Sequence, residues 1–355
     1  MVTLKKRINA LNHLGKLFEE LCNSKKNSKY DFWIKKFEKE IIVAHQYNNW
    51  FTKEYILLSL NQWSKELSKK NIISWIKEYN IKDCSDKTVA IIMAGNLPLV
   101  GFHDLLCAIL LNFNCIIKLS SNDKVLIPLI VDYLNTLIPS FKNKIKFVDK
   151  PLKNFDGVIA TGSNSSFKHF EYYFKNYPRV LRKSRHSIAI LNGKESKSDL
   201  KSLGNDIFNY FGMGCRSVSK IFVPTNYNFD LLFNALYDFR DIINHNKYAN
   251  NYDYNKAVYL MGEQKFIENG FLLIKKDNNL GSPIACLFYE NYNSISEIKK
   301  KVKSFEDSLQ CVVSNIDIFS SIKFGLSQYP KINNYADNVD TLKFLLKIWW
   351  YLVKL

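Results

Sequence analysis

One cysteine lies in a segment that favours reactive chemistry. Cys215 occurs in Phe211-Gly-Met-Gly-Cys-Arg-Ser217, between a predicted helix and a predicted strand. Two glycines just before a cysteine let the backbone turn tightly and bring main-chain amides near the sulfur. Such amides stabilise a thiolate and a developing oxyanion, and Arg216 adds positive charge. The pattern makes Cys215 a candidate nucleophile; a small core residue is the alternative interpretation.

A second candidate is a side-chain amide that follows the first apolar run. Asn96 occurs in Ala94-Gly-Asn-Leu-Pro-Leu99, directly after the run Thr88-Val-Ala-Ile-Ile-Met93. Its amide can donate a hydrogen bond to an oxyanion. Asparagine after glycine is also an ordinary turn residue. The motif alone therefore fits both a catalytic role and a purely structural one.

Two further polar loops follow predicted strands. Lys118 lies near the end of the run Cys115-Ile-Ile-Lys-Leu119, and Ser120 comes next. A lysine there needs a partner such as a cofactor phosphate or ribose. Alternatively, its side chain extends so that its own ammonium group reaches solvent. The segment Ala160-Thr-Gly-Ser-Asn-Ser-Ser166 places amides and hydroxyls at a helix N-terminus, where anions bind. Simple capping by serine or asparagine is the alternative, and the segment is not a GxGxxG fingerprint.

An alternation of strands and helices positions these candidates. Residues 1–86 repeat apolar positions every three or four residues and are predicted to be helical, with Thr52 as a cap. Strands alternating with helices then indicate βαβ units and a parallel sheet, whose ligands bind at the carboxyl ends of the strands. A second unit begins after about residue 193, with a helix at 198–211 and a strand at 220–223. In the first unit we expect strands at 88–93, 115–119, 144–148 and 157–160, and helices at 101–112 and 124–138.

The overall composition argues against two classes of protein. The chain has 355 residues, 47% hydrophobic and 14% aromatic, so it can bury a core and is not globally disordered. A net charge of +17 by itself points to nucleic acid, but the basic residues are scattered and nearly all lysine. We therefore expect no nucleic-acid partner. The charge is better interpreted as a field that attracts anionic cofactors and substrates.

The cysteines and the apolar runs give expectations about location. Seven cysteines occur without a CxxC pair, so neither a disulfide framework nor a metal site is predicted. No signal-peptide core follows the basic start, and no apolar run reaches the ~18–20 residues of a transmembrane helix. A reducing cytoplasm is the expected location. Core positions are predicted for Cys107, Cys115, Cys286 and Cys311.

Taken together, these motifs resemble the aldehyde dehydrogenase superfamily, and more closely the LuxC-type long-chain fatty acyl-CoA reductases. The superfamily order is the Asn96 loop, then Lys118, then Thr161-Gly162-Ser163, then Gly214-Cys215. The resemblance covers residues from about 88 to 346. The closer match rests on Ala94-Gly-Asn-Leu-Pro-Leu-Val-Gly-Phe-His-Asp104, Ala160-Thr-Gly-Ser163, Phe170-Glu-Tyr-Tyr-Phe174, Asp206-Ile-Phe208 with Gly214-Cys-Arg216, and Tyr335-Ala-Asp-Asn-Val-Asp-Thr341.

The resemblance implies an α/β fold with a Rossmann-type cofactor-binding domain. Its domains would be a helical N-terminal segment (1–86), a nicotinamide-cofactor-binding domain (87–193), a catalytic domain that carries the cysteine (194–325), and a C-terminal segment (326–355). The last segment includes the apolar run Ile348-Trp-Trp-Tyr-Leu-Val-Lys-Leu355, a candidate oligomer contact.

The resemblance also implies roles for single residues. Cys215 matches the nucleophile that carries the acyl group, and Asn96 matches an oxyanion-hole amide that acts with the Cys215 main-chain amide. Lys118, with Ser120 beside it, matches the lysine at the cofactor's adenosine ribose or phosphate. Thr161, Gly162 and Ser163 match the loop under the pyrophosphate.

The implied activity is the reduction of an acyl-CoA or another acyl thioester to a fatty aldehyde. NADPH is the implied cofactor, with NADH as the alternative. An acyl-supplying synthetase or transferase and a homo-oligomer are the implied partners.

Two departures from the superfamily favour thioester reduction over aldehyde oxidation. Ile190, in Ile190-Leu-Asn-Gly-Lys194, takes the place of the glutamate that activates water in aldehyde-oxidising members. Asn279, in Asn279-Leu-Gly-Ser-Pro283, takes the place of a glutamate at the nicotinamide ribose. An acyl-enzyme that waits for hydride benefits from lacking a water-activating base. The same losses would occur in a degenerate relative that binds dinucleotide or a partner without turnover.

The group that protonates the departing thiol stays open on sequence alone. His103, His169 and His186 are the candidates, and His186 in Arg182-Lys-Ser-Arg-His186 is favoured. Under the alternative interpretation, the basic residues of that segment bind CoA phosphates.

Overall fold

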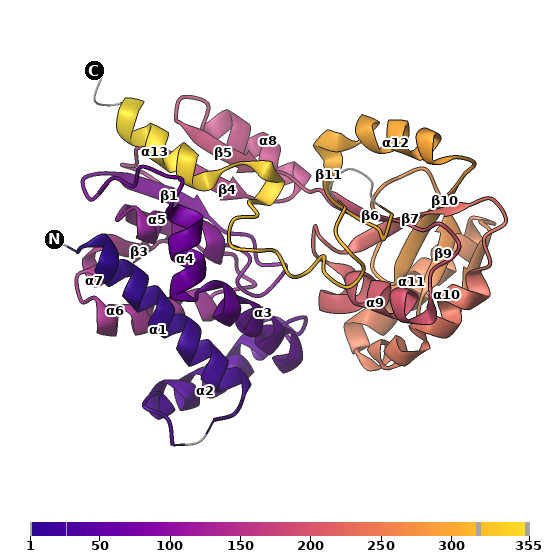
Figure 1. Cartoon of the computed structure of the whole chain (residues 1–355), viewed down its shortest axis with the longest axis horizontal. Coiled ribbons are helices and arrows are strands. Elements are labelled where there is room, and N and C mark those ends of the chain that lie inside the picture. The colour runs from indigo at the N-terminus through magenta and orange to yellow at the C-terminus, as the bar shows by residue number, and fades with distance from the viewer. Residues whose placement is uncertain (1, 26, 317–320, 352–355) are drawn as a thin grey trace. The chain divides into compact units, whose positions relative to one another are not determined.

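The computed structural model describes residues 2–25, 27–316 and 321–351, and the chain divides into two compact units (Figure 1). Unit 1 comprises Met1–Lys183 and Lys331–Leu355, and unit 2 comprises Ser184–Pro330. Of the apolar C-terminal run that is a candidate oligomer contact, residues 352–355 lie outside the described residues. Within the described part of the chain, no helix is long and apolar enough to cross a bilayer.

The N-terminal part of unit 1 is helical, as predicted. Three of its four helices begin at a serine or threonine cap, whose oxygen accepts a hydrogen bond from an otherwise unpaired amide of the first turn. Thr52 is such a cap and accepts from the amide of Tyr55. The helices are α1 (Leu4–Cys22), α2 (Asp31–Tyr47), α3 (Lys53–Glu66) and α4 (Lys69–Ile76).

A parallel sheet of five strands forms the centre of unit 1, in the order β3-β2-β1-β4-β5. The strands and helices predicted between residues 88 and 161 all occur, and their ends differ from the prediction by two residues at most. The strands are β1 (Thr88–Ile92), β2 (Asn114–Lys118), β3 (Ile145–Phe147), β4 (Gly157–Thr161) and β5 (Arg179–Arg182). The helices between them are α5 (Phe102–Leu110), α6 (Leu126–Leu137), α7 (Phe141–Lys144) and α8 (Asn164–Tyr173).

Both faces of this sheet are covered, and the strand residues alternate between the two faces. In β1, Val89 and Ile91 pack with α1, α5 and α6, whereas Ala90 packs with Phe170 and Phe174 on the other face. The order of the strands reverses between β1 and β4, because β2 and β3 lie on one side of β1 whereas β4 and β5 lie on the other. In open α/β sheets, dinucleotides bind at the carboxyl ends of strands where the strand order reverses.

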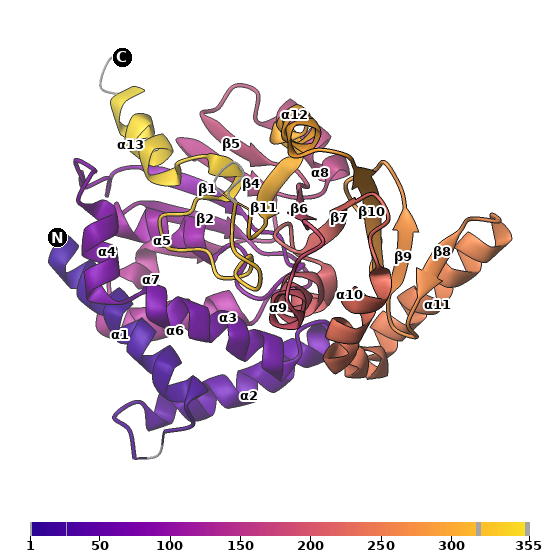
Figure 2. The same cartoon turned by 45° about the vertical axis from the view of Figure 1, so that its right-hand side comes forward.

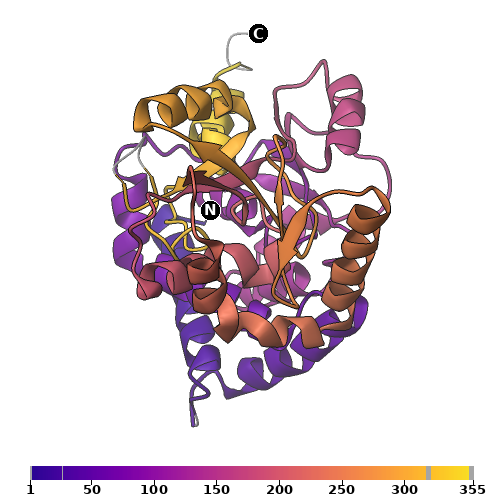
Figure 3. The ribbon, with the colours of Figure 1, turned by 90° about the vertical axis from the view of Figure 1, so that its right-hand side faces the viewer.

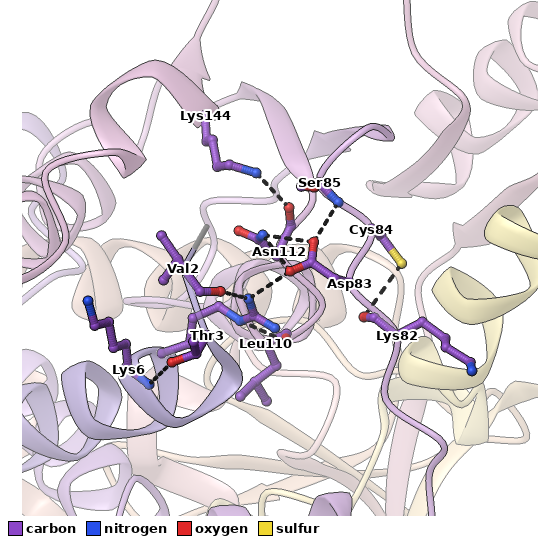
Figure 4. A network of polar contacts seen from close by, with 11 residues as sticks. Val2, Thr3, Lys6, Lys82, Asp83, Cys84, Ser85, Leu110, Asn112 and Lys144 are labelled. Atoms are coloured by element: carbon purple, nitrogen blue, oxygen red, sulfur yellow. Dashed lines mark hydrogen bonds and ion pairs between the residues drawn. The ribbon is translucent and has the colours of Figure 1, made fainter.

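A polar network ties the start of α1 to the loop before β1. The buried Arg7 guanidinium donates to the Leu110 carbonyl at 3.1 Å and lies 3.5 Å from the Asp83 carboxylate. Asn112 also donates to Asp83, at 2.9 Å, and the Lys144 ammonium donates to the Asn112 carbonyl at 3.0 Å (Figure 4). These contacts all lie before β1, β2 and β3, at the edge of the sheet opposite the candidate cofactor loops.

The C-terminal segment returns to unit 1 and is fastened there by a buried ion pair. Arg182, at the end of β5, binds both oxygens of Asp104 in α5 and donates to the Thr341 hydroxyl at 3.0 Å. Thr341 opens α13 (Thr341–Tyr351), drawn in yellow in Figure 1. The 3-10 helix η4 (Ala336–Asn338) precedes α13.

Aromatic contacts fasten the same segment a second time. The His103 ring stacks on Trp63 and Trp75, and its Nε2 lies 2.7 Å from the Ile332 carbonyl oxygen. The Tyr335 hydroxyl accepts from the Trp75 indole at 2.8 Å. Two of the motifs that carried the family resemblance therefore pack against each other.

Unit 2 has a second sheet, in the order β11-β6-β7-β10-β9-β8, which is parallel except for the β8–β9 pair (Figure 2). Its strands are β6 (His186–Ile190), β7 (Val218–Pro224), β8 (Phe266–Glu268), β9 (Leu273–Lys276), β10 (Cys286–Tyr292) and β11 (Leu309–Val313). Its helices are α9 (Lys197–Phe208), α10 (Phe229–Leu236), α11 (Asn246–Met261) and α12 (Ile295–Ser304), with the 3-10 helices η1 (Asn209–Gly212), η2 (Tyr237–Asn244) and η3 (Glu306–Ser308).

Helices cover both faces of the second sheet, as Figure 3 shows with α12 in gold on one side. Ile221 and Val223 of β7 pack with α9 and α10, whereas Phe222 packs with α12. Of the four cysteines predicted to be core residues, Cys107, Cys115 and Cys286 are buried and Cys311 is half-buried. Cys215 is exposed.

Candidate active site

The loop after β1 brings Asn96 to the carboxyl edge of the first sheet, where its side chain is exposed. Gly95 is needed there because a Cβ atom at this position would lie 2.5 Å from the Ser120 Oγ. Farther along the loop, Leu99 has a φ of 62°, and its amide donates to the Asp123 carboxylate at 3.3 Å. Burial raises the pKa of Asp123 to about 7. The loop that carries Asn96 is therefore packed against the loop that follows β2.

Lys118 is the last residue of β2 and lies beside Ile92, the last residue of β1. Its side chain is half-buried, and its carbonyl accepts from the amide of Met93 at 3.0 Å. The Ser120 hydroxyl accepts from the amide of Asn122 at 3.2 Å. Lys118 and Ser120 thus share the edge with the Asn96 loop.

The third loop of this edge follows β4. Thr161 ends the strand, and its hydroxyl lies 3.5 Å from the Arg182 guanidinium. A Cβ atom at Gly162 would lie 2.9 Å from the Cβ of Ser166, so α8 packs closely on the loop. The Ser163 hydroxyl accepts from the amide of Ser166 and caps α8, the structural alternative raised from the sequence. A capped helix start still presents main-chain amides to an anion.

The carboxyl edge of the sheet in unit 1 has the features expected of a dinucleotide-binding site. Asn96, Lys118 and the loop from Thr161 to Ser163 lie at the carboxyl ends of three neighbouring strands of one sheet, on both sides of the reversal between β1 and β4. Gly95 and Gly162 are both positions where a Cβ atom would crowd a neighbouring side chain, that of Ser120 or of Ser166. Lys118 contributes a positive charge and α8 contributes a helix N-terminus.

In unit 2, Cys215 lies on an irregular turn before β7. The helix predicted over 198–211 is shorter in the structure, since α9 ends at Phe208. Three consecutive residues then adopt positive φ values: Tyr210 (56°), Phe211 (57°) and Gly212 (73°). Left-handed backbone at two aromatic residues is strained and is retained where the surroundings require it.

Hydrogen bonds close the Cys215 turn from inside. The amide of Ser217 donates to the Gly214 carbonyl at 2.9 Å, and the amide of Gly214 donates to the Ser217 hydroxyl at 3.2 Å. The Ser187 hydroxyl donates to the Cys215 carbonyl at 2.8 Å. The exposed thiol is thus carried by a turn whose backbone is held on both sides.

The three candidate histidines lie in different surroundings. His103 is enclosed by aromatic rings in unit 1, and His169 is exposed on α8. His186 opens β6 in unit 2 and directly precedes Ser187, which bonds to Cys215. Burial lowers the pKa of His186 and favours its neutral form. A Cβ atom at Gly281 would lie 2.2 Å from the His186 ring, so the segment from 279 to 283 packs directly on it.

The two departures from the oxidising enzymes have clear positions. Ile190 is fully buried in β6 and packs with Phe222 and Ile298, so its side chain belongs to the core. Asn279 is exposed, and its main-chain amide donates to the Asp277 carboxylate at 2.9 Å.

The fold of the two units is that of the aldehyde dehydrogenases. An acetylating aldehyde dehydrogenase from Geobacillus thermoglucosidasius matches 96% of this chain and 90% of its own, with a TM-score of 0.62 and 12% identity. Aldehyde dehydrogenase 21 from Physcomitrella patens, solved with succinate, matches 96% of this chain and 80% of its own, with a TM-score of 0.62 and 10% identity. At such identities the likeness shows the fold alone, and the predicted fold class is confirmed.

The sequence places the chain within a family. The model of the acyl-CoA reductase (LuxC) family matches residues 3–232, and the chain belongs to this family. That range includes Asn96, Lys118 and Cys215. Among curated proteins, Protein Ycf2 from Physcomitrium patens is 23% identical in an alignment 206 residues long, which covers 52% of this chain and only 9% of Ycf2.

Proposed function

We propose that this protein reduces a long-chain fatty acyl thioester to a fatty aldehyde, with NADPH as reductant and Cys215 as the acyl carrier. The observation that carries this proposal is the exposed Cys215 on a backbone-held turn, in a chain of the acyl-CoA reductase family. The fold supports it, because the edge loops of unit 1 fit a dinucleotide.

The first half-reaction is acyl transfer. The Cys215 thiolate attacks the thioester carbonyl, and the oxyanion that forms accepts from the Cys215 main-chain amide and, by the family resemblance, from the Asn96 side chain. The bond from carbon to the leaving sulfur breaks, the leaving thiolate takes a proton, and an acyl-Cys215 thioester remains. His186 is our candidate for proton handling, because burial favours its neutral imidazole, which can take the proton of the Cys215 thiol and return it to the leaving thiolate.

The second half-reaction removes the acyl group as aldehyde. NADPH, when bound, supplies the hydride that adds to the thioester carbonyl. The Cys215 sulfur then leaves, takes a proton, and the aldehyde carbonyl forms. Hydrolysis competes only if a base activates water, and the position of the usual glutamate is occupied by the buried Ile190.

The charges at the end of β2 favour NADPH over NADH. Enzymes that prefer NAD place a carboxylate near the adenosine ribose, whereas a basic residue accommodates the 2′-phosphate. Here the strand ends with Lys118, and Ser120 lies two residues further on. The nearest carboxylate in the loop, Asp123, is buried and bonded to the Leu99 amide.

The carrier of the acyl group and the partners follow from the family resemblance. We propose acyl-CoA as the donor, an acyl-supplying synthetase or transferase as a partner, and a homo-oligomeric state. Size-exclusion chromatography with light scattering measures the oligomeric state directly.

An aldehyde assay tests the proposed function. The protein is incubated with NADPH and either hexadecanoyl-CoA or butanoyl-CoA, and the aldehyde is trapped with a hydrazine and quantified. We expect aldehyde from the long chain, none from Cys215→Ala, and an unchanged yield from the control Cys22→Ala, whose thiol is half-buried with a pKa raised by burial to about 11. Binding of NADPH without aldehyde from either donor would instead indicate a degenerate relative.

A further inference from the structure

A buried carboxylate in unit 2 organises a loop far away in the sequence. Asp206, in α9, is completely buried and accepts from the amide of Gly325 at 2.6 Å and from the amide of Ser327 at 2.9 Å. Gly325 has a φ of 82°, which favours glycine, and a Cβ there would lie 3.2 Å from Ser202. The loop that contains residues 325–328 is therefore held against α9 by the Asp206 side chain.

The next residue of that loop reaches the Cys215 turn. Gln328 is 8% exposed, and its Nε2 donates to the Ser217 hydroxyl at 3.0 Å. The same hydroxyl oxygen accepts from the amide of Gly214, so Gln328 and Gly214 share one acceptor. A continuous series of contacts thus leads from Asp206 through Gln328 and Ser217 to Gly214.

A second contact holds the other side of the turn. The Ser187 hydroxyl lies 2.8 Å from the Cys215 carbonyl oxygen and 3.0 Å from the Cys311 sulfur. A carbonyl oxygen can only accept, so the single hydroxyl proton goes to Cys215, and the Cys311 thiol donates to Ser187. The carbonyl groups of both Gly214 and Cys215 are therefore fixed by hydrogen bonds.

Fixing these carbonyls fixes the direction of the Cys215 amide. The Gly214 carbonyl and the Cys215 N–H belong to one planar trans peptide, in which they point in opposite directions. Because the Gly214 carbonyl accepts from the Ser217 amide inside the turn, the Cys215 N–H points away from the turn's interior. That is the direction required of an amide that donates to an oxyanion formed at the Cys215 sulfur.

We infer that Asp206, Gln328 and Ser187 are positioning residues that aim the Cys215 main-chain amide for acyl transfer. The inference rests on the proposed function and deepens it. None of the three side chains needs to touch the substrate, because each acts through the backbone of the turn.

The test distinguishes a change in the direction of the Cys215 main-chain amide from a general disruption of the turn. Acyl transfer to Cys215 needs an oxyanion donor, whereas alkylation of its thiol by iodoacetamide is a displacement at saturated carbon and needs none. Both rates are measured on the full chain by intact mass, for the wild type, Gln328→Ala and Gln328→Glu. The matched control is Gln310→Ala in β11, which is also 8% exposed and lies in the same unit.

In Gln328→Ala we expect hexadecanoyl transfer to slow about tenfold, a part of the 10²–10³-fold cost of losing one oxyanion donor. Alkylation by iodoacetamide should keep its wild-type rate. Glutamate at position 328 should restore part of the transfer rate, since its carboxylate can accept from the Ser217 hydroxyl and keep it in place. Gln310→Ala should leave both rates unchanged.

Asp206→Asn is the second variant, in case Gln328→Ala folds poorly. It retains one acceptor oxygen and should slow acyl transfer while alkylation continues. Unchanged acyl transfer in both variants, or a parallel fall in transfer and alkylation, would overturn the inference. Failure of the proposed function itself looks different, because acyl transfer would then be absent from the wild type or would persist in Cys215→Ala.

Discussion

Asn96 sits on a loop that neighbouring residues hold from several sides. Gly95 packs on Ser120, the Leu99 amide donates to Asp123, and the Ser59 hydroxyl donates to the Pro98 carbonyl at 3.2 Å. An exposed amide on a fixed loop costs little reorganisation when it meets a developing charge. The held loop is compatible with the oxyanion role that the family resemblance implies for Asn96.

Substitution of Asn96 tests that role. In Asn96→Ala, acyl transfer to the protein should slow by roughly 10²–10³-fold, the usual effect of losing one oxyanion donor. NADPH affinity should not change, as measured by fluorescence titration. Asn122→Ala is the control, because Asn122 is an exposed asparagine of the neighbouring loop. Normal transfer in Asn96→Ala would remove Asn96 from the site.

Asp123 gives a prediction about pH and stability. Burial raises the pKa of its carboxyl from 3.8 to about 7, so the folded protein favours the protonated form more than the unfolded chain does. The folded state then binds more protons between these two values, and the free energy of unfolding falls as pH rises through them. Asp123→Asn removes this titration.

Urea unfolding between pH 5 and pH 8 measures the effect. The variant Asp123→Asn should lose less stability than the wild type over this range and should be the more stable of the two at pH 8. An identical pH dependence in both proteins would show that Asp123 does not titrate there.

At the scale of elements, α13 is fastened to α5 and β5 by a buried ion pair. Arg182 and Asp104 are both almost fully buried, and Arg182 also bonds to Thr341. Breaking one partner of a buried pair typically costs about 3–5 kcal/mol, because the other charge remains buried. Asp104→Asn should therefore lower the thermal midpoint clearly. Asp132→Asn, which removes the exposed pair of Asp132 with Lys36, should change it little.

If Asp104→Asn and Asp132→Asn shift the thermal midpoint equally, the ion pair does not fasten α13. A selective loss would show that the stretch Tyr335–Thr341, one of those on which the family resemblance rests, serves stability in unit 1. The sequence offered no means of seeing this, since Arg182 and Asp104 lie 78 residues apart and no local pattern pairs them.

The predicted elements show what local patterns can and cannot reveal. β1, β2 and β4 were predictable because continuous apolar runs end at polar loops, which is typical of buried parallel strands. β5 was not, because Arg179 and Arg182 interrupt its apolar character. The left-handed Tyr210 and Phe211 were also missed, since nothing in an aromatic residue signals a positive φ. The support of the Cys215 turn by Gln328 and Asp206 depends on contacts across more than a hundred residues, which the sequence does not pair.

At the scale of the whole molecule, the proposed nucleophile and the proposed cofactor residues belong to different units. Lys118 and Ser163, which we propose to bind the cofactor, belong to unit 1, and Cys215 belongs to unit 2. Lys118→Ala should weaken NADPH binding about 10- to 100-fold, the usual effect of losing a hydrogen bond to a charged group. Acyl transfer to Cys215 in the absence of NADPH should proceed at the wild-type rate.

Titration of NADPH and of NADH into the wild type and Lys118→Ala measures this effect. If Lys118 meets the 2′-phosphate, NADPH affinity falls and NADH affinity is nearly unchanged. Equal losses for the two dinucleotides would place Lys118 at the ribose instead. No loss for either one would remove Lys118 from the cofactor site.

The central claim is that Cys215 carries the acyl group and releases it to hydride. Intact mass spectrometry after incubation with hexadecanoyl-CoA, with and without NADPH, tests it most directly in the wild type and in Cys215→Ala. We predict a gain of one acyl group in the wild type that disappears when NADPH is added, and no gain in Cys215→Ala. An adduct that persists in Cys215→Ala, or one that NADPH fails to discharge, would contradict the claim.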